Sequence, residues 1–312
     1  MAEKNLLKGF TITTPDSYQI RGMFFSPAIQ PKRQVLIVLG RNELPYKYLE
    51  LYEELNALGY LICVYDHRGQ GFNEHLTPPP AKCHIDSFDT YADDFMQVLS
   101  SLDSSIPCSV LAVSMGCLVV LRSMQLHPVR KLVDNVIFVS PFLGLKQPVP
   151  HFLIALIAKF KEKLTNIIYH EKNSFFYPHD VFMERVVGIN ANTHDRNRNE
   201  VYYSLYRKFP ETRLGGVTTN WLLAALKCLK QVNCKDYKLD LPALFLIAEN
   251  DNIVNSNKAL KFIPLLNNSN KQIEYSIIKN SLHDILIEED NFRNEAVKSI
   301  KDFLARDFSM KS

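Results

Sequence analysis

Six short apolar runs, separated by helical patterns, constrain the fold of this chain more than any other feature. In chain order the runs occupy residues 34–40, 61–66, 109–114, 135–140, 241–249 and 272–280. Most of them are continuously apolar, which is typical of parallel strands buried on both faces of a sheet. Helical patterns follow the first three runs, at residues 46–60, 88–102 and 115–127. This order predicts an α/β fold with a mostly parallel central sheet and helices on both faces.

The alternation of strand and helix patterns stops between the fourth and fifth runs. Residues 145–238 have helical or irregular patterns without a clear apolar strand. We therefore expect a core in two parts, 1–144 and 239–312, with a helical cap or lid inserted at 145–238. Residues 151–240 hold 14 Lys+Arg against 9 Asp+Glu, whereas the remainder holds 22 against 24. The cap is thus expected to be the basic part of the molecule.

The amino-acid composition of the chain restricts its possible functions and its cellular compartment. The chain has 312 residues, 46% of them hydrophobic, which is enough to bury a large core. A net charge of +3, with no Lys/Arg run longer than two residues, argues against nucleic-acid binding. The six cysteines lack metal-binding spacing and are expected to be buried free thiols in a reducing compartment. The chain is therefore expected to be cytoplasmic, and peripheral contact with the cytosolic face of the inner membrane stays open.

Ser114 stands where the third apolar run meets a helical pattern. It is the centre of an A-x-S-x-G sequence with Ala112 and Gly116 on either side. A G-x-S-x-G serine sits on a sharp strand-to-helix turn that exposes its hydroxyl, and small neighbours are needed because the backbone passes close by. Ala112 replaces the first glycine of that motif. On this pentapeptide alone, a serine that merely caps a helix remains a competing interpretation.

A serine nucleophile needs a base and a group that orients the base. The fifth apolar run is followed by Asp251 and the sixth by His283, both in loops at the carboxyl ends of strands. Open α/β sheets place their ligands at this edge, and the order serine, acid, histidine is the one expected for such a nucleophile elbow. Ser114, Asp251 and His283 are therefore predicted to be nucleophile, acid and base. Glu249 remains a rival for the role of the acid.

Two backbone N–H groups are candidates for an oxyanion hole. Met115 follows the predicted nucleophile at the start of a helix, and Arg41 lies in the loop after the first apolar run. The chain has no phosphate-binding glycine loop, no dinucleotide fingerprint and no cluster of histidines and cysteines with metal spacing. We therefore expect neither an organic cofactor nor a metal.

These motifs together resemble the serine hydrolases of the monoacylglycerol lipase and lysophospholipase group within the α/β-hydrolase fold. The matching stretches include "VLGRNELPYKYLELYEELNALGY" (38–60) and "VYDHRGQGFNEH" (64–75). More specifically, the chain resembles bacterial PldB-type lysophospholipases, also within the insertion, at "THDRNR" (193–198) and "RLGGVTTNW" (213–221). Apart from Ala112, the main departure is an asparagine at position 73, where the wider group often has serine.

The resemblance implies hydrolysis of the acyl ester of a lysophospholipid, through an acyl-serine intermediate, to a free fatty acid and a glycerophospho-alcohol. A monoacylglycerol lipase or general carboxylesterase with the same three residues is the first alternative. A non-catalytic ligand-binding domain is a weaker one, because it predicts that one of the three would be lost. Acyl transfer instead of hydrolysis, acyl-chain length, head-group preference and oligomeric state stay open.

Residues of the predicted cap suggest which substrate the protein binds. Residues 151–168 form an amphipathic pattern that either contacts lipid or packs on the core. Arg196, Arg198 and Arg213 are candidates for contact with an anionic head group, and a solvated basic face is the alternative. The expected partner is a lysophospholipid or another monoacyl lipid, and membrane lipid is a further candidate that the cap would touch.

Overall fold

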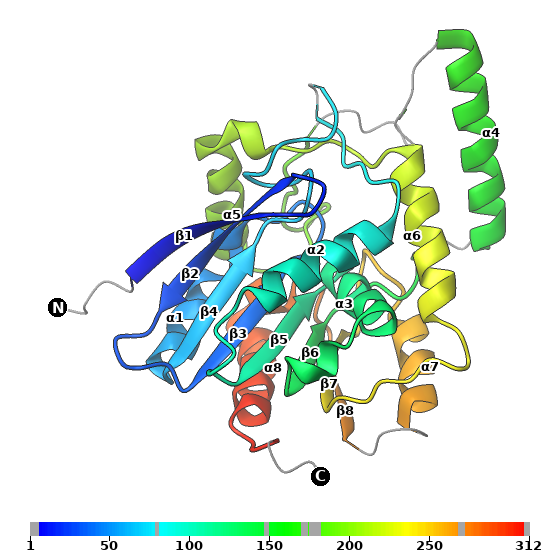
Figure 1. Ribbon diagram of the computed structural model, residues 1–312. Coiled ribbons are helices and arrows are strands. Elements are labelled where there is room, and N and C mark those ends of the chain that lie inside the picture. Colours follow the sequence, from blue (N-terminus) through cyan, green and yellow to red (C-terminus); the bar gives the residue numbers. More distant parts are fainter. Residues whose placement is uncertain are drawn as a thin grey trace.

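The computed structural model describes residues 6–78, 81–146, 150–169, 174, 182–267 and 272–308, whose arrangement is drawn in Figure 1. They contain one eight-stranded sheet with the strand order β1-β2-β4-β3-β5-β6-β7-β8. The strands are β1 (Leu6–Thr13), β2 (Gln19–Ser26), β3 (Arg33–Val38), β4 (Tyr60–Tyr65), β5 (Cys108–Val113), β6 (Asn135–Val139), β7 (Ala243–Ala248) and β8 (Ile273–Ile278). Strands β3 to β8 are parallel, and β1 and β2 add an antiparallel edge. The predicted mostly parallel sheet is confirmed.

The apolar runs lack alternation because both faces of the sheet are covered. All six residues of β5 are buried. Val110 and Ala112 pack into the apolar cluster on one face, while Leu111 and Val113 pack into the cluster on the other. Strand β2, near the antiparallel edge, has a mixed pattern of exposed and buried residues. The six cysteines are all free, as expected, and five of them are buried.

Helices cover both faces of the sheet. The α-helices of the described residues are α1 (Leu49–Ala57), α2 (Phe88–Ser100), α3 (Met115–Leu126), α4 (His151–Tyr169), α5 (Arg196–Lys208), α6 (Thr219–Val232), α7 (Ser256–Asn267) and α8 (Asp290–Leu304). Short 3-10 turns occur at Pro45–Tyr48, Val129–Lys131, Pro210–Thr212 and Ile285–Ile287. Helices α1 and α8 pack on one face, and α2, α3, α6 and α7 pack on the other. The α/β-hydrolase architecture expected from the sequence is therefore present.

The chain between β6 and β7 forms α4, α5 and α6. Helix α6 packs into the same apolar cluster as α2 and α3, through Ala225, Cys228 and Leu229. Figure 1 shows α4 standing off from the body beside α6, and α5 toward the other side of the view. Helices thus occur where the sequence predicts an insertion, whereas its boundaries at residues 145 and 238 stay a prediction.

Candidate active site

Ser114 occupies a sharp turn between β5 and α3. Its backbone angles are φ 50° and ψ −112°, a region that residues with a side chain rarely adopt. Gly116 allows the turn to pack closely, because a Cβ atom at this position would lie 2.3 Å from the carbonyl oxygen of Val38. Ala112, in place of the first glycine, is accommodated as a buried residue of β5. The predicted strand–turn–helix elbow is therefore present.

Ser114, His283 and Asp251 form one series of hydrogen bonds. Ser114 Oγ lies 2.9 Å from His283 Nε2, and His283 Nδ1 lies 2.7 Å from Asp251 Oδ2. His283 and Asp251 are buried, whereas Ser114 is half-buried. When Nδ1–H donates to the carboxylate, Nε2 is free to accept the serine proton. The geometry thus allows the hydroxyl to pass its proton to the imidazole.

The structure distinguishes the two candidate acids. Asp251 contacts His283 through Oδ2 and accepts two backbone N–H groups at 2.8 Å each through Oδ1, which fixes the carboxylate. Glu249 is exposed, and its Oε2 accepts the N–H of Asn280 at 2.9 Å. Of the two carboxylates, Asp251 is the one that contacts the imidazole.

The surroundings of His283 raise its pKa above the usual 6.5. Burial by itself would lower the pKa of an imidazole. The charge of Asp251 and its hydrogen bond favour the protonated ring, and the Asp284 carboxylate adds to this, so the net change is upward. His283 is therefore a stronger base than a solvent-exposed histidine.

The two predicted oxyanion donors come from segments that pack against each other. Met115 is the first residue of α3, and its N–H is one of those that have no partner within a helix. Arg41 lies in the loop after β3. Gly116 brings the two segments together, since a Cβ atom there would approach the carbonyl oxygens of Val38 and Leu39. The end of β3, just before Arg41, therefore packs against the start of α3, and the oxyanion role of the two N–H groups stays a prediction.

Buried charges that sequence reasoning did not identify hold residues 40–43, which we name the oxyanion loop after the role predicted for Arg41. Glu43 Oε2 accepts the N–H of Gly40 at 2.6 Å. Lys47 Nζ lies 2.6 Å from Glu43 Oε1 and 3.0 Å from Asp284 Oδ1. All three charged side chains are buried. They connect the oxyanion loop with the residue that follows the predicted base.

The oxyanion loop is also held from the side of the insertion. Asn42 has a φ of 55°, and its carbonyl oxygen accepts the hydroxyls of Tyr202 at 2.8 Å and Tyr206 at 2.6 Å. Its N–H donates to Gln70 Oε1 at 2.7 Å. Helix α5 therefore contacts the loop that contains Arg41.

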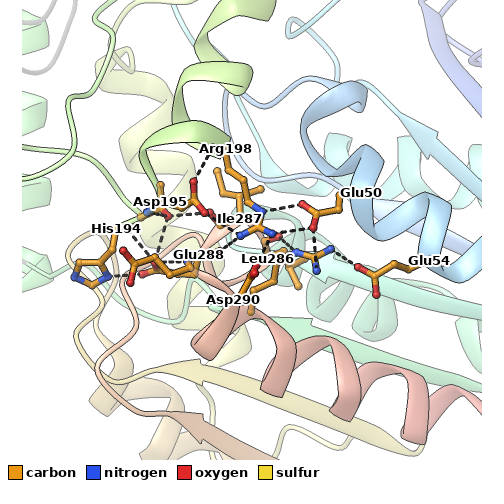
Figure 2. A network of polar contacts seen from close by, with 12 residues as sticks. Glu50, Glu54, His194, Asp195, Arg198, Leu286, Ile287, Glu288 and Asp290 are labelled. Atoms are coloured by element: carbon orange, nitrogen blue, oxygen red, sulfur yellow. Dashed lines mark hydrogen bonds and ion pairs between the residues drawn. The ribbon is translucent and has the colours of Figure 1, made fainter.

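A second polar network, drawn in Figure 2, holds the segment that carries His283. The fully buried carboxylate of Glu288 accepts the N–H of Leu282 at 2.8 Å. It also accepts the N–H and the ring Nδ1–H of His194, at 2.9 Å each. The loop of the predicted base is thus attached to the segment just before α5.

The three arginines predicted to contact a head group lie on or beside α5. Arg196 is exposed in its first turn. Arg198 forms ion pairs with carboxylates of α1, of α8 and of the residue that caps its own helix (Figure 2). Arg213 donates from Nε to the carbonyl oxygen of Tyr206 at 2.9 Å. Head-group contact by these residues stays a prediction, and most N–H groups of Arg198 already have protein acceptors.

Comparison with known proteins supports the same fold. The model of the family described as serine aminopeptidase, S33, matches residues 29–290. Probable lysophospholipase L2 of Haemophilus influenzae is 29% identical over 285 residues, covering 88% of this chain and 86% of its own. Lysophospholipase L2 of Escherichia coli is 29% identical over 282 residues, covering 88% and 81%. A soluble variant of monoglyceride lipase from Saccharomyces cerevisiae, in complex with a substrate analog, superposes with a TM-score of 0.71 at 19% identity, covering 97% and 96%.

Proposed function

The chain belongs to the serine aminopeptidase S33 family. We propose that it hydrolyses carboxylic esters and that Ser114 is the nucleophile. The observation that carries this proposal is the series of hydrogen bonds from Ser114 through His283 to Asp251. A buried carboxylate, an imidazole with a raised pKa and a half-buried hydroxyl are the components of acyl transfer to serine.

In the first half of the proposed reaction, His283 accepts the hydroxyl proton as Ser114 Oγ attacks the acyl carbonyl carbon. The negative charge that develops on the carbonyl oxygen is stabilised by the backbone N–H groups of Arg41 and Met115. Asp251 keeps the ring in the required tautomer and stabilises the imidazolium. The C–O bond of the ester then breaks, and His283 gives its proton to the departing alcohol.

In the second half, water replaces the alcohol. His283 removes a proton from the water as its oxygen attacks the acyl-serine carbonyl. Collapse of this second tetrahedral species releases the fatty acid, and the proton returns to Ser114. A different alcohol at the position of the water would give acyl transfer by the same steps.

We propose a single-chain lipid, in first place a lysophospholipid, as the substrate. Two relatives that match 88% of this chain are named lysophospholipase L2 or probable lysophospholipase L2. A monoacylglycerol is the alternative, since a protein named monoglyceride lipase homolog from Monkeypox virus is 25% identical over 292 residues.

We also propose that the protein works in the cytoplasm and meets its lipid at the cytosolic face of the inner membrane, with the insertion in peripheral contact. Among the described residues, no helix combines the length and the apolarity needed to cross a bilayer. Helix α4 carries apolar side chains on its exposed surface, which supports contact with lipid.

The test is the release of free fatty acid by the purified protein, by Ser114→Ala and by the control Ser299→Ala on α8. Each receives lysophosphatidylethanolamine, lysophosphatidylcholine, monoacylglycerol, a short p-nitrophenyl ester and an aminoacyl p-nitroanilide. We expect release from the lysophospholipids that is lost only in Ser114→Ala. Preference for monoacylglycerol would identify the alternative, a monoacylglycerol lipase. Turnover of the anilide alone would overturn the proposal of ester hydrolysis.

A further inference from the structure

A groove between α4, α6 and α7 has no part in the chemistry described above. It encloses about 1060 Å³, and its walls come from these three helices, with Asp86 and Leu143 beside them. Figure 1 shows α4 beside α6, with α7 next along the same side of the molecule. Helix α5, which contains Arg196 and Arg198, lies toward the other side of the view, and Arg213 is not among the described lining residues of the groove. The groove is therefore a surface separate from the predicted head-group residues.

The groove is lined by basic side chains without acidic partners. Its five lysines are exposed: Lys159, Lys227, Lys230, Lys258 and Lys261. Among the described residues, none of these five forms an ion pair. Helices α6 and α7 contain no acidic residue, and Asp86 is the one carboxylate among the described residues that line the groove. Burial and the positive charge of Lys258 together lower the pKa of His151 at the same wall, as expected for a positive field.

The outer surface of α4, at the rim of this groove, is apolar and exposed. Phe152 and Phe160 are each 70% exposed, and Leu156 and Ile167 are each 63% exposed. The remaining exposed apolar residues of the helix are Leu153, Ile157 and Leu164. Among the side chains of α4 that the structure describes, Ile154 and Ala158 are the buried ones, and both pack against the body. Exposed apolar surface of this extent marks a binding face.

We propose that the lysines of the groove and the exposed face of α4 together bind the surface of a bilayer that contains anionic phospholipid. The lysines take the phosphate groups, and the apolar side chains of α4 enter the acyl boundary. A second copy of this chain fits less well, because a two-fold contact would bring the lysines of both copies together. This proposal deepens the membrane contact in the proposed function by naming the face and its lipid.

The test is binding of the full chain to vesicles of phosphatidylcholine, with and without phosphatidylglycerol, measured by co-sedimentation. We expect stronger partition onto the anionic vesicles, weakened by salt because the attraction is screened. Replacing Lys227 and Lys230 by glutamine lowers partition onto anionic vesicles about tenfold. Replacing Phe152 and Phe160 by serine lowers partition onto both kinds of vesicle.

The matched control replaces Lys279 and Lys298, exposed lysines outside the groove, by glutamine and leaves partition unchanged. Equal loss in both lysine pairs, or none in Lys227→Gln/Lys230→Gln, would overturn the proposal. So would lipid-free self-association that disappears in Phe152→Ser/Phe160→Ser, since α4 would then bind a second copy. Hydrolysis of a short p-nitrophenyl ester by every variant separates this question from the proposed function. If a groove variant hydrolyses the ester normally and still binds vesicles, the proposed membrane-binding role of the groove fails, whereas the proposed ester hydrolysis is unaffected.

Discussion

The backbone of Ser114 stores strain beside the atoms that are proposed to react. A residue with a side chain at φ 50° and ψ −112° costs about 1–3 kcal/mol relative to a relaxed backbone. The surroundings hold it there: its N–H donates to Val139 at 2.9 Å, and its carbonyl oxygen accepts the N–H of Phe142 at 3.1 Å. The turn directs the hydroxyl toward His283 Nε2. The strained turn and its hydrogen bonds thus both fix the position of Ser114 Oγ.

Replacing Ser114 by glycine should stabilise the protein relative to replacing it by alanine. Both variants lose the hydrogen bond to His283, but only glycine adopts the positive φ without strain. We expect Ser114→Gly to unfold with a free energy about 1 kcal/mol higher than that of Ser114→Ala. Urea titration of the two inactive variants measures the difference, and equal midpoints would contradict strain at this turn.

The raised pKa of His283 predicts how activity falls at acidic pH, which is the acid limb of the pH profile. Protonated imidazole cannot accept the serine proton, so kcat/KM should fall as the pH drops through a pKa above 6.5. Asp251→Asn removes the charge that raises this pKa, so the limb should move to lower pH and kcat should fall about 10⁴-fold. Glu249→Gln is the matched control and should keep both the limb and kcat. If the acid limb shifted in Glu249→Gln and not in Asp251→Asn, Glu249 rather than Asp251 would be the acid.

Glu43 is predicted to support the oxyanion loop and the stability of the fold. In Glu43→Gln, Lys47 stays buried with Asp284 as its remaining carboxylate, which should lower the unfolding free energy by about 3 kcal/mol. Gly40 loses its charged acceptor, so kcat should fall at least about tenfold while KM changes little. Chemical denaturation and steady-state kinetics measure both effects. Glu53→Gln, an exposed change on α1, should alter neither, and unchanged kcat in Glu43→Gln would remove the positioning role.

At the scale of elements, α5 is attached both to the oxyanion loop and to the loop of the proposed base, His283. Its two tyrosine hydroxyls reach the carbonyl oxygen of Asn42. Arg198 joins the helix to α1 and α8, and Glu288 attaches the segment before the helix to the loop of His283 (Figure 2). Movement of α5 would therefore displace both halves of the proposed site together.

This coupling predicts a kinetic effect of removing two hydroxyls. In Tyr202→Phe/Tyr206→Phe, the carbonyl oxygen of Asn42 loses both donors and the oxyanion loop gains freedom. We expect kcat to fall about tenfold with a smaller change in KM, since donor geometry matters most in the transition state. Tyr203→Phe, on the same helix, is the control and should keep kcat. A larger change in KM than in kcat would place the tyrosines in substrate binding instead.

At the scale of the whole molecule, the parallel sheet explains why three residues far apart in the sequence meet. Strands β5, β7 and β8 end at the same edge, and Ser114, Asp251 and His283 each follow one of these ends. The apolar runs therefore predicted both the sheet and the place of these residues. The order of the strands in the chain was enough to predict that the three residues lie at the same edge of the sheet, because the loops after parallel strands lie at one edge.

The supporting contacts could not be predicted in the same way. Glu43 and Lys47 are four residues apart, a spacing that the sequence displays, but Asp284 is 237 residues from Lys47. Its contact depends on how two loops pack at the end of the fold. The lysines of the groove come from three helices, so their convergence likewise depends on tertiary packing. The sequence placed Asp251 before Glu249 as the acid, but deciding between the two required the direction of each side chain in its loop.

The most direct measurement is covalent labelling with a fluorophosphonate, which reacts with an activated serine. The labelled protein is digested, and the modified peptide is identified by mass spectrometry. We predict a single adduct on Ser114 that disappears in His283→Ala, which lacks the base, and persists in Glu249→Gln. No adduct on the folded protein, or one on another serine, would contradict Ser114 as the nucleophile.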